Sequence, residues 1–132
     1  MPGASETIDW RRLREFAGVD LTGSFVLTWY LEADTLFIDS DILLLPTHPF
    51  YEKPRPAEKV CIRPAILEFP FCTGVSVDGS TGGSDIRAFV SRLGHGAISG
   101  MQRYDDGRYE LQGEFGTVTI EAERPVLRLK GL

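Results

Sequence analysis

The sequence predicts a mainly β fold, an antiparallel β-sandwich or partly open barrel of about eight strands with one short N-terminal helix. Apolar and polar residues alternate over residues 25–31 and again over residues 109–122. Successive side chains of a strand point to opposite faces, so this alternation places the apolar set on one buried face. Turn-forming residues separate the strand patterns at short intervals, and strands and helices do not alternate, which favours an antiparallel arrangement.

Residues 6–17 predict the helix. Ser5 can accept a hydrogen bond from an exposed backbone N–H at its start, and Gly18 is a suitable end. The apolar residues of this segment form an imperfect stripe that can lie against the sheet: Ile8, Trp10, Leu13, Phe16 and Ala17.

Two strands follow, over residues 24–31 and 35–45, joined by a turn at residues 32–34. Ser40 falls on the apolar face of the second strand, which predicts a bulge or an approach to the sheet margin. Residues 46–58 contain four prolines. Because proline removes a backbone donor and fixes φ, this segment is expected to be a stiff, extended surface loop.

The rest of the chain adds the remaining strands. Pro64 indicates an edge position or a bulge in the strand that contains it. Residues 78–85 predict a flexible, glycine-rich connection, and residues 86–93 have helical spacing that ends at the glycines flanking His95. Strands are expected over residues 59–67, 71–77, 97–104, 109–115, 117–123 and 126–129, with a hairpin turn at Asp105–Arg108 and breaks in the apolar phase at Gly116 and Pro125.

Length and composition predict one domain over residues 1–132. The net charge is −5, and a negative surface repels phosphate backbones and anionic lipid, so neither nucleic acid nor membrane is an expected partner. The N-terminal residues lack a secretory signal pattern, which predicts a cytoplasmic protein. In that compartment Cys61 and Cys72 are expected to be reduced thiols.

No catalytic residues, metal ligands or cofactor are predicted. The four nitrogen and sulfur donors, His48, His95, Cys61 and Cys72, are isolated in sequence, unlike the closely spaced pairs of structural zinc sites. Asp39 and Asp41 share one face of a strand, where a solvated polar face explains them.

The candidate binding residues lie in and near the proline-rich loop: His48, Tyr51, Glu52, Arg55 and Arg63. Surface loops held on a rigid sheet are where binding groups concentrate, and a histidine near a carboxylate can act as a base or a pH-sensitive contact. A structural interpretation competes with this one. In it, Phe50 and Tyr51 pin the loop to the sheet and His48 caps a turn.

Residues 23–29, 48–58 and 106–118 resemble segments of a group of small, uncharacterised bacterial proteins of similar length. The resemblance covers most of the chain from residue 20 onward. It implies a bacterial, cytoplasmic protein and supplies no catalytic residues.

These observations together predict a non-enzymatic binding or protein-interaction domain, with a protein partner or a second copy of the chain as the expected ligand. An acidic, compact domain suits a basic target. The alternative is a small-molecule-binding β-barrel, or a small enzyme that uses His48 and nearby carboxylates.

Overall fold

The computed structural model describes residues 6–81 and 85–131 and shows one open, antiparallel sheet of ten strands. The elements are β1 (Thr7–Asp9), β2 (Val19–Glu32), β3 (Thr35–Leu44), β4 (Cys61–Phe69), β5 (Gly74–Val77), β6 (Ser80–Thr81), α1 (Ile86–Ser91), β7 (Gly96–Tyr104), β8 (Tyr109–Gly113), β9 (Gly116–Glu121) and β10 (Val126–Leu129). The strand order is β10-β4-β3-β2-β7-β8-β9-β5-β6, and β1 pairs with β7.

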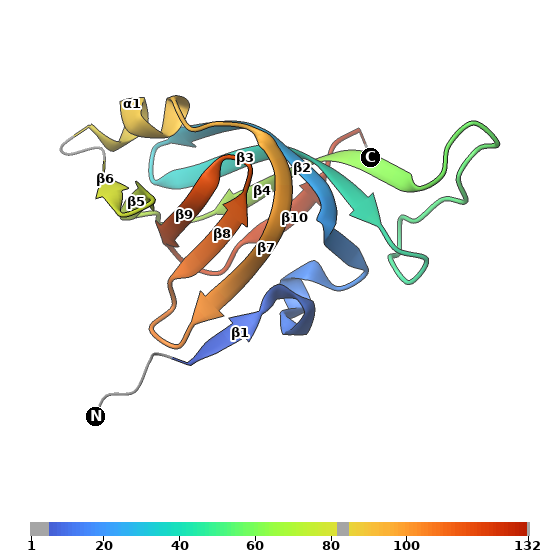
Figure 1. The fold of residues 1–132 in the computed structure, drawn as a ribbon, viewed down its shortest axis with the longest axis horizontal. Coiled ribbons are helices and arrows are strands. Elements are labelled where there is room, and N and C mark those ends of the chain that lie inside the picture. The colour runs from blue at the N-terminus through green and yellow to red at the C-terminus, as the bar shows by residue number, and fades with distance from the viewer. Residues whose placement is uncertain (1–5, 82–84, 132) are drawn as a thin grey trace.

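The sheet has two halves that are joined at a short junction between β2 and β7. Only the pairs Phe25–Ala97 and Val26–Gly96 connect these strands. The half that contains β7, β8 and β9 lies over the half that contains β3, β4 and β10 (Figure 1). Their inner faces meet, because the Phe69 ring of β4 packs edge-on against the Tyr109 ring of β8 with centroids 5.3 Å apart.

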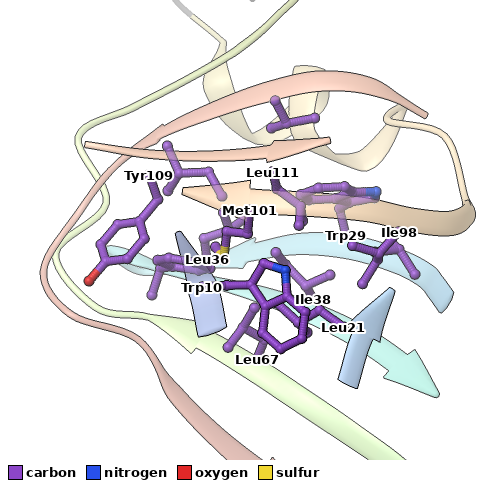
Figure 2. Packing of buried hydrophobic residues seen from close by; sticks show 14 of the residues in the cluster. Trp10, Leu21, Trp29, Leu36, Ile38, Leu67, Ile98, Met101, Tyr109 and Leu111 are labelled. Atoms are coloured by element: carbon purple, nitrogen blue, oxygen red, sulfur yellow. The ribbon is translucent and has the colours of Figure 1, made fainter. Parts of the chain in front are cut away.

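Side chains from both halves fill the space between them. Figure 2 shows Leu36, Ile38 and Leu67 from one half packed near Met101 and Leu111 from the other. All five side chains are buried. The interior is therefore a packed core.

Trp29 is the large aromatic side chain that β2 contributes to this core. Its side chain is only 3% exposed. The indole Nε1–H donates to the carbonyl of Gly94 at 2.6 Å, and the ring packs edge-on against Phe115. The single polar atom of this large side chain is thus satisfied in the interior.

The predicted strands are confirmed, with their ends shifted by a few residues. The turn at Asp105–Arg108 joins β7 to β8 as expected. The break in the apolar phase at Gly116 is a tight turn, since Gly113 pairs with Gly116 across it. Gly116 has φ +102°, which suits glycine.

The predicted helix over residues 6–17 is wrong. Residues 7–9 form β1, and two short 3₁₀ turns follow at Trp10–Arg12 and Arg14–Phe16. The buried side chains Trp10, Leu13 and Phe16 recur every three residues, which is the period of a 3₁₀ helix, and β1 gains hydrogen bonds by pairing with β7. Ser5, the expected cap, lies outside the described residues.

The bulge or sheet-margin position predicted at Ser40 is wrong, because β3 lies between β2 and β4 and pairs regularly with β4 at this residue. Ser40 keeps a regular register with Val26 of β2 and Ala65 of β4. Leu27 is the extra residue, because Val26 pairs with Ser40 and Thr28 already pairs with Asp39. The irregularity between these two strands is therefore a bulge in β2, which the Ser40 pattern did not predict.

A second irregularity in β2 is bridged by a serine hydroxyl. Residues 21–24 bulge out of the register between Asp20 and Phe25. The buried Ser24 Oγ accepts from the backbone N–H of Leu43 at 2.9 Å and donates to the carbonyl of Asp20 at 2.8 Å. This side chain satisfies backbone groups that the bulge leaves without strand partners.

Pro64 lies inside β4, which is not an edge strand, because β3 and β10 flank it. The pairing with β10 ends at Ala65, so Pro64 lies one residue beyond it.

Of the predicted glycine-rich connection, Ser80–Thr81 forms the short strand β6, and residues 82–84 lie outside the described part of the chain. The helical spacing after it corresponds to α1, which Asp85 caps by accepting from the Ala88 N–H.

Candidate functional site

The proline-rich loop projects from one end of the molecule, between β3 and β4 (Figure 1). Within it His48 organises a turn. Its backbone N–H donates to the carbonyl of Leu45, and its Nδ1 accepts from the backbone N–H of Phe50 at 3.0 Å. This arrangement matches the structural interpretation of His48 as a turn cap.

The base of the loop is held against the body of the protein. Tyr51 packs partly buried against the core. Gly18 has φ +75°, and a Cβ at this residue would come within 2.8 Å of the His48 Cα. Glycine at this position therefore allows the loop to approach the start of β2.

The charged candidates form two separate surface pairs. Arg63 Nη2 lies 3.4 Å from Glu52 Oε2, and Arg55 Nε lies 3.9 Å from Glu58 Oε1. Of the five candidates, the structure thus brings Glu52 and Arg63 together and leaves Arg55 apart from them. Exposed pairs of this kind contribute little to stability, and neither pair contains His48.

The position of His48 predicts a pH response. Burial lowers the pKa of His48 below 6.5, so the unfolded chain takes up the proton first as the pH falls. The free energy of unfolding is therefore highest above pH 6.5. It falls as the pH drops below 6.5, until the folded imidazole is protonated as well.

An NMR titration should give a His48 pKa below 6.5 together with loss of the Phe50 amide hydrogen bond. The variant His48→Asn keeps an acceptor without the titration, and it should abolish this step. A His48 pKa above 6.5 would contradict the geometry.

Among residues 6–81 and 85–131, no three His, Cys, Asp or Glu side chains gather closely enough to hold a metal ion. Asp39, which was predicted to share a strand face with Asp41, lies 3.2 Å from Lys130 Nζ. It also accepts a hydrogen bond from Thr28 Oγ1. Cys61 and Cys72 are both buried and not cross-linked.

Within the described part of the chain, no helix has the length and apolar character needed to span a membrane.

A half-open cleft of about 730 Å³ lies where the β7–β8 hairpin, the end of β9 and the β4–β5 connection meet. We call it the Arg103 cleft. It is lined by Phe71, Thr73, Arg103, residues 106–109 and residues 121–124. None of the loop candidates lines it.

A buried carboxylate supports the floor of the Arg103 cleft. The Tyr109 hydroxyl donates to Glu15 Oε2 at 3.2 Å, and Arg124 Nη1 lies 3.2 Å from Glu15 Oε1. The Glu15 side chain is only 7% exposed. Burial, with the nearby negative charge of Glu15 and its hydrogen bond, raises the pKa of Tyr109 to about 12. The hydroxyl therefore stays protonated and holds the carboxylate in place.

The three arginines of the cleft differ in their partners. Arg108 forms an ion pair with Asp106 at 2.8 Å, and Arg124 is paired with Glu15. Arg103 has no ion pair within the described residues, and its buried Nε has no hydrogen-bond partner there. Its guanidinium lies 5.9 Å from the centroid of the Tyr109 ring.

Sequence reasoning missed this cleft because its residues come from distant segments. Glu15 is 94 positions from Tyr109 and 109 positions from Arg124. One signal was present in the predicted hairpin turn, since pairing across it places Arg103 opposite Tyr109. That pairing alone did not reveal that the arginine lacks a partner.

Comparison with known proteins adds neither a family nor a function. No family model, no curated protein and no solved structure matches the chain.

Proposed function

We propose that this protein is a non-enzymatic binding domain that takes a small ligand into the Arg103 cleft. The observation that carries the proposal is the cleft itself, whose volume of about 730 Å³ falls within the range of small-molecule sites. Within the described residues, buried side chains such as Trp29, Leu36 and Met101 occupy the space between the two halves of the sheet. A ligand is therefore expected at the end of the sheet.

The proton-bearing groups near the cleft favour binding over chemistry. The Tyr109 hydroxyl is held by Glu15, and its pKa of about 12 keeps it protonated. Glu15 is engaged on both oxygens, by Tyr109 and Arg124. His48 belongs to the projecting loop, and its Nδ1 is occupied by the Phe50 N–H. Tyr109 and Glu15 therefore support the structure of the cleft, and His48 lies outside it.

A bacterial, cytoplasmic setting is part of this proposal. It is supported by the resemblance to bacterial segments and by the two uncrosslinked thiols, Cys61 and Cys72. Thiols that are not cross-linked suit a reducing compartment.

Filling the cleft should abolish binding. Thr73 is exposed and lines the cleft, so Thr73→Trp places a large side chain in the space that a ligand needs. We expect a library of small carboxylates, amines and amino acids to shift the amide signals of the lining residues in the unmodified protein, and Thr73→Trp to remove at least nine-tenths of that response.

Thr28→Trp is the matched control, because Thr28 is exposed on β2 and lies outside the cleft. It should bind like the unmodified protein. Unchanged binding in Thr73→Trp would refute the proposed site.

A protein-interaction function through the outer face of β2 is the second candidate. Phe25 and Leu27 are neighbours on this strand and are 44% and 46% exposed. Apolar side chains gathered on a surface favour contact with another protein. In the same NMR experiment, shifts confined to Phe25 and Leu27 that grow with protein concentration would favour this candidate over the cleft.

A further inference from the structure

The half of the sheet that contains β3, β4 and β10 has a second face, which points away from the core. β7, β8 and β9 lie over its inner face (Figure 1). Successive side chains of a strand point to opposite faces, so the neighbours of the buried residues point outward. On β3 and β10 these outward side chains are exposed or half-buried: Phe37, Asp39, Asp41, Val126, Arg128 and Lys130. We call the surface that they form with the outward side chains of β4 the β3–β10 face.

The strand register arranges the β3–β10 face in three rows that cross β3, β4 and β10. The rows are Phe37, Glu68 and Val126; Asp39, Ile66 and Arg128; and Asp41, Pro64 and Lys130. Lys130 belongs to the third row because its backbone N–H donates to the Pro64 carbonyl at 2.9 Å. In the order of the rows, the side chains of β3 are therefore apolar, acidic and acidic, and those of β10 are apolar, basic and basic.

This pattern makes the β3–β10 face complementary to a copy of itself. A two-fold axis along β4 brings β3 of one copy over β10 of the other and keeps each row opposite the same row. Phe37 of one copy then meets Val126 of the other, and the two acidic residues of β3 meet the two basic residues of β10. Pro64 and Ile66 lie on the axis, where the apolar side chains of the two copies pack on each other. A face with one sign of charge suits an oppositely charged partner, whereas matched acids and bases suit a second copy.

Ion pairs within the chain leave part of this charge available to a partner. Arg128 lies 2.9 Å from Glu68, and Lys130 lies 3.2 Å from Asp39. Glu68, which faces its own copy across the axis, is therefore balanced within each chain. The side chains of Arg128 and Lys130 nevertheless remain 66% and 42% exposed. Asp41 forms no ion pair within residues 6–81 and 85–131, so it is the acid of this face that a second copy can pair.

We propose that the β3–β10 face is a homodimer interface, in which two copies pack face to face about a two-fold axis along β4. Sheets pack in this way about 10 Å apart, with their strands within about 30° of each other. The three rows extend about 14 Å along the strands and about 10 Å from β3 to β10, which is small for a protein interface. We therefore expect a weak dimer, with a dissociation constant of the order of 10–100 µM. This inference goes beyond the proposed ligand site and does not depend on it.

Sedimentation equilibrium of the full chain at low salt measures the association. A concentration series that spans the expected dissociation constant should show a monomer and a dimer in equilibrium. Added salt should weaken the dimer, because exposed ion pairs are screened. In NMR spectra recorded over the same series, the amide signals that shift should belong to β3, β4 and β10.

Two charge reversals test the register. Asp41→Lys places like charges opposite Lys130 in both halves of the dimer, and Lys130→Asp does the same opposite Asp41. Each variant alone should dimerise at least about tenfold more weakly than the unmodified protein. An equimolar mixture of the two variants should regain the dimer, because each chain then keeps the residue that the other chain's substitution needs. Circular dichroism checks that both variants are folded.

Asp105→Lys is the matched control. It makes the same change of charge at an exposed residue in the turn between β7 and β8, which belongs to the other half of the sheet. This variant should dimerise like the unmodified protein.

Three results would overturn the proposal. The first is an unmodified chain that stays monomeric throughout the concentration series. The second is a mixture of folded Asp41→Lys and Lys130→Asp chains that stays monomeric, since the register then fails. The third is a set of concentration-dependent shifts confined to Phe25 and Leu27, which would place the contact on β2. Each of these leaves the Arg103 cleft to its own test with the ligand library.

Discussion

Replacing Trp29 with alanine is expected to lower the free energy of unfolding by about 3–5 kcal/mol, as truncation of a large buried aromatic side chain does. Trp29 is 3% exposed, so the variant loses buried apolar area and leaves a cavity beside Phe115. It also removes the donor to the Gly94 carbonyl. Denaturant unfolding followed by circular dichroism measures the change as a lower midpoint with an unchanged slope.

Leu27→Ala is the matched control for this prediction. Leu27 lies two residues away on the same strand and is 46% exposed. Its truncation should change the free energy of unfolding by less than about 1 kcal/mol. Equal effects of the two variants would contradict the assignment of Trp29 to the core.

Replacing Glu15 with alanine is expected to lower the free energy of unfolding by about 2–3 kcal/mol, since hydrogen bonds to a charged group and unpaired buried donors each carry effects of this size. The variant leaves the buried Tyr109 hydroxyl without its acceptor and Arg124 without its ion pair. The same denaturant experiment measures the loss.

Two further variants test the cause of this effect. Glu15→Gln keeps an acceptor for Tyr109 but removes the charge, so its effect should lie between those of the unmodified protein and Glu15→Ala. Glu58→Ala removes a carboxylate from the exposed pair with Arg55 and should have almost no effect. A loss in Glu58→Ala as large as that in Glu15→Ala would refute the role given to burial.

The strands were predictable because their signal is local. Alternation along β2, β3 and β8 reflects the burial of one face of the sheet. The hairpin turn was predictable because Asp106 and Gly107 are residue types that tolerate the backbone conformation of such a turn. The N-terminal segment was not predictable in the same way. Pairing of β1 with β7 and burial of Trp10 decide its conformation, and both depend on residues far along the chain.

The candidate site shows the same division. The sequence drew attention to His48 and its neighbours because they form a dense run of aromatic and charged residues, and the structure gives His48 the role of a turn cap. Arg103 has an ordinary local sequence. Its place in the lining of a cleft is a property of the assembled fold that composition and spacing do not carry.

The contacts beneath the Arg103 cleft also bear on the order of folding. Glu15 reaches Tyr109 across 94 positions and Arg124 across 109 positions. Contacts between such distant residues close long loops, and the entropy of that closure makes them slow to form. The hairpin of β7 and β8 can form early from local contacts. The Glu15 carboxylate contacts Tyr109 and Arg124 only after the first and last parts of the chain have come together. Binding competence should therefore appear only in molecules that have completed folding.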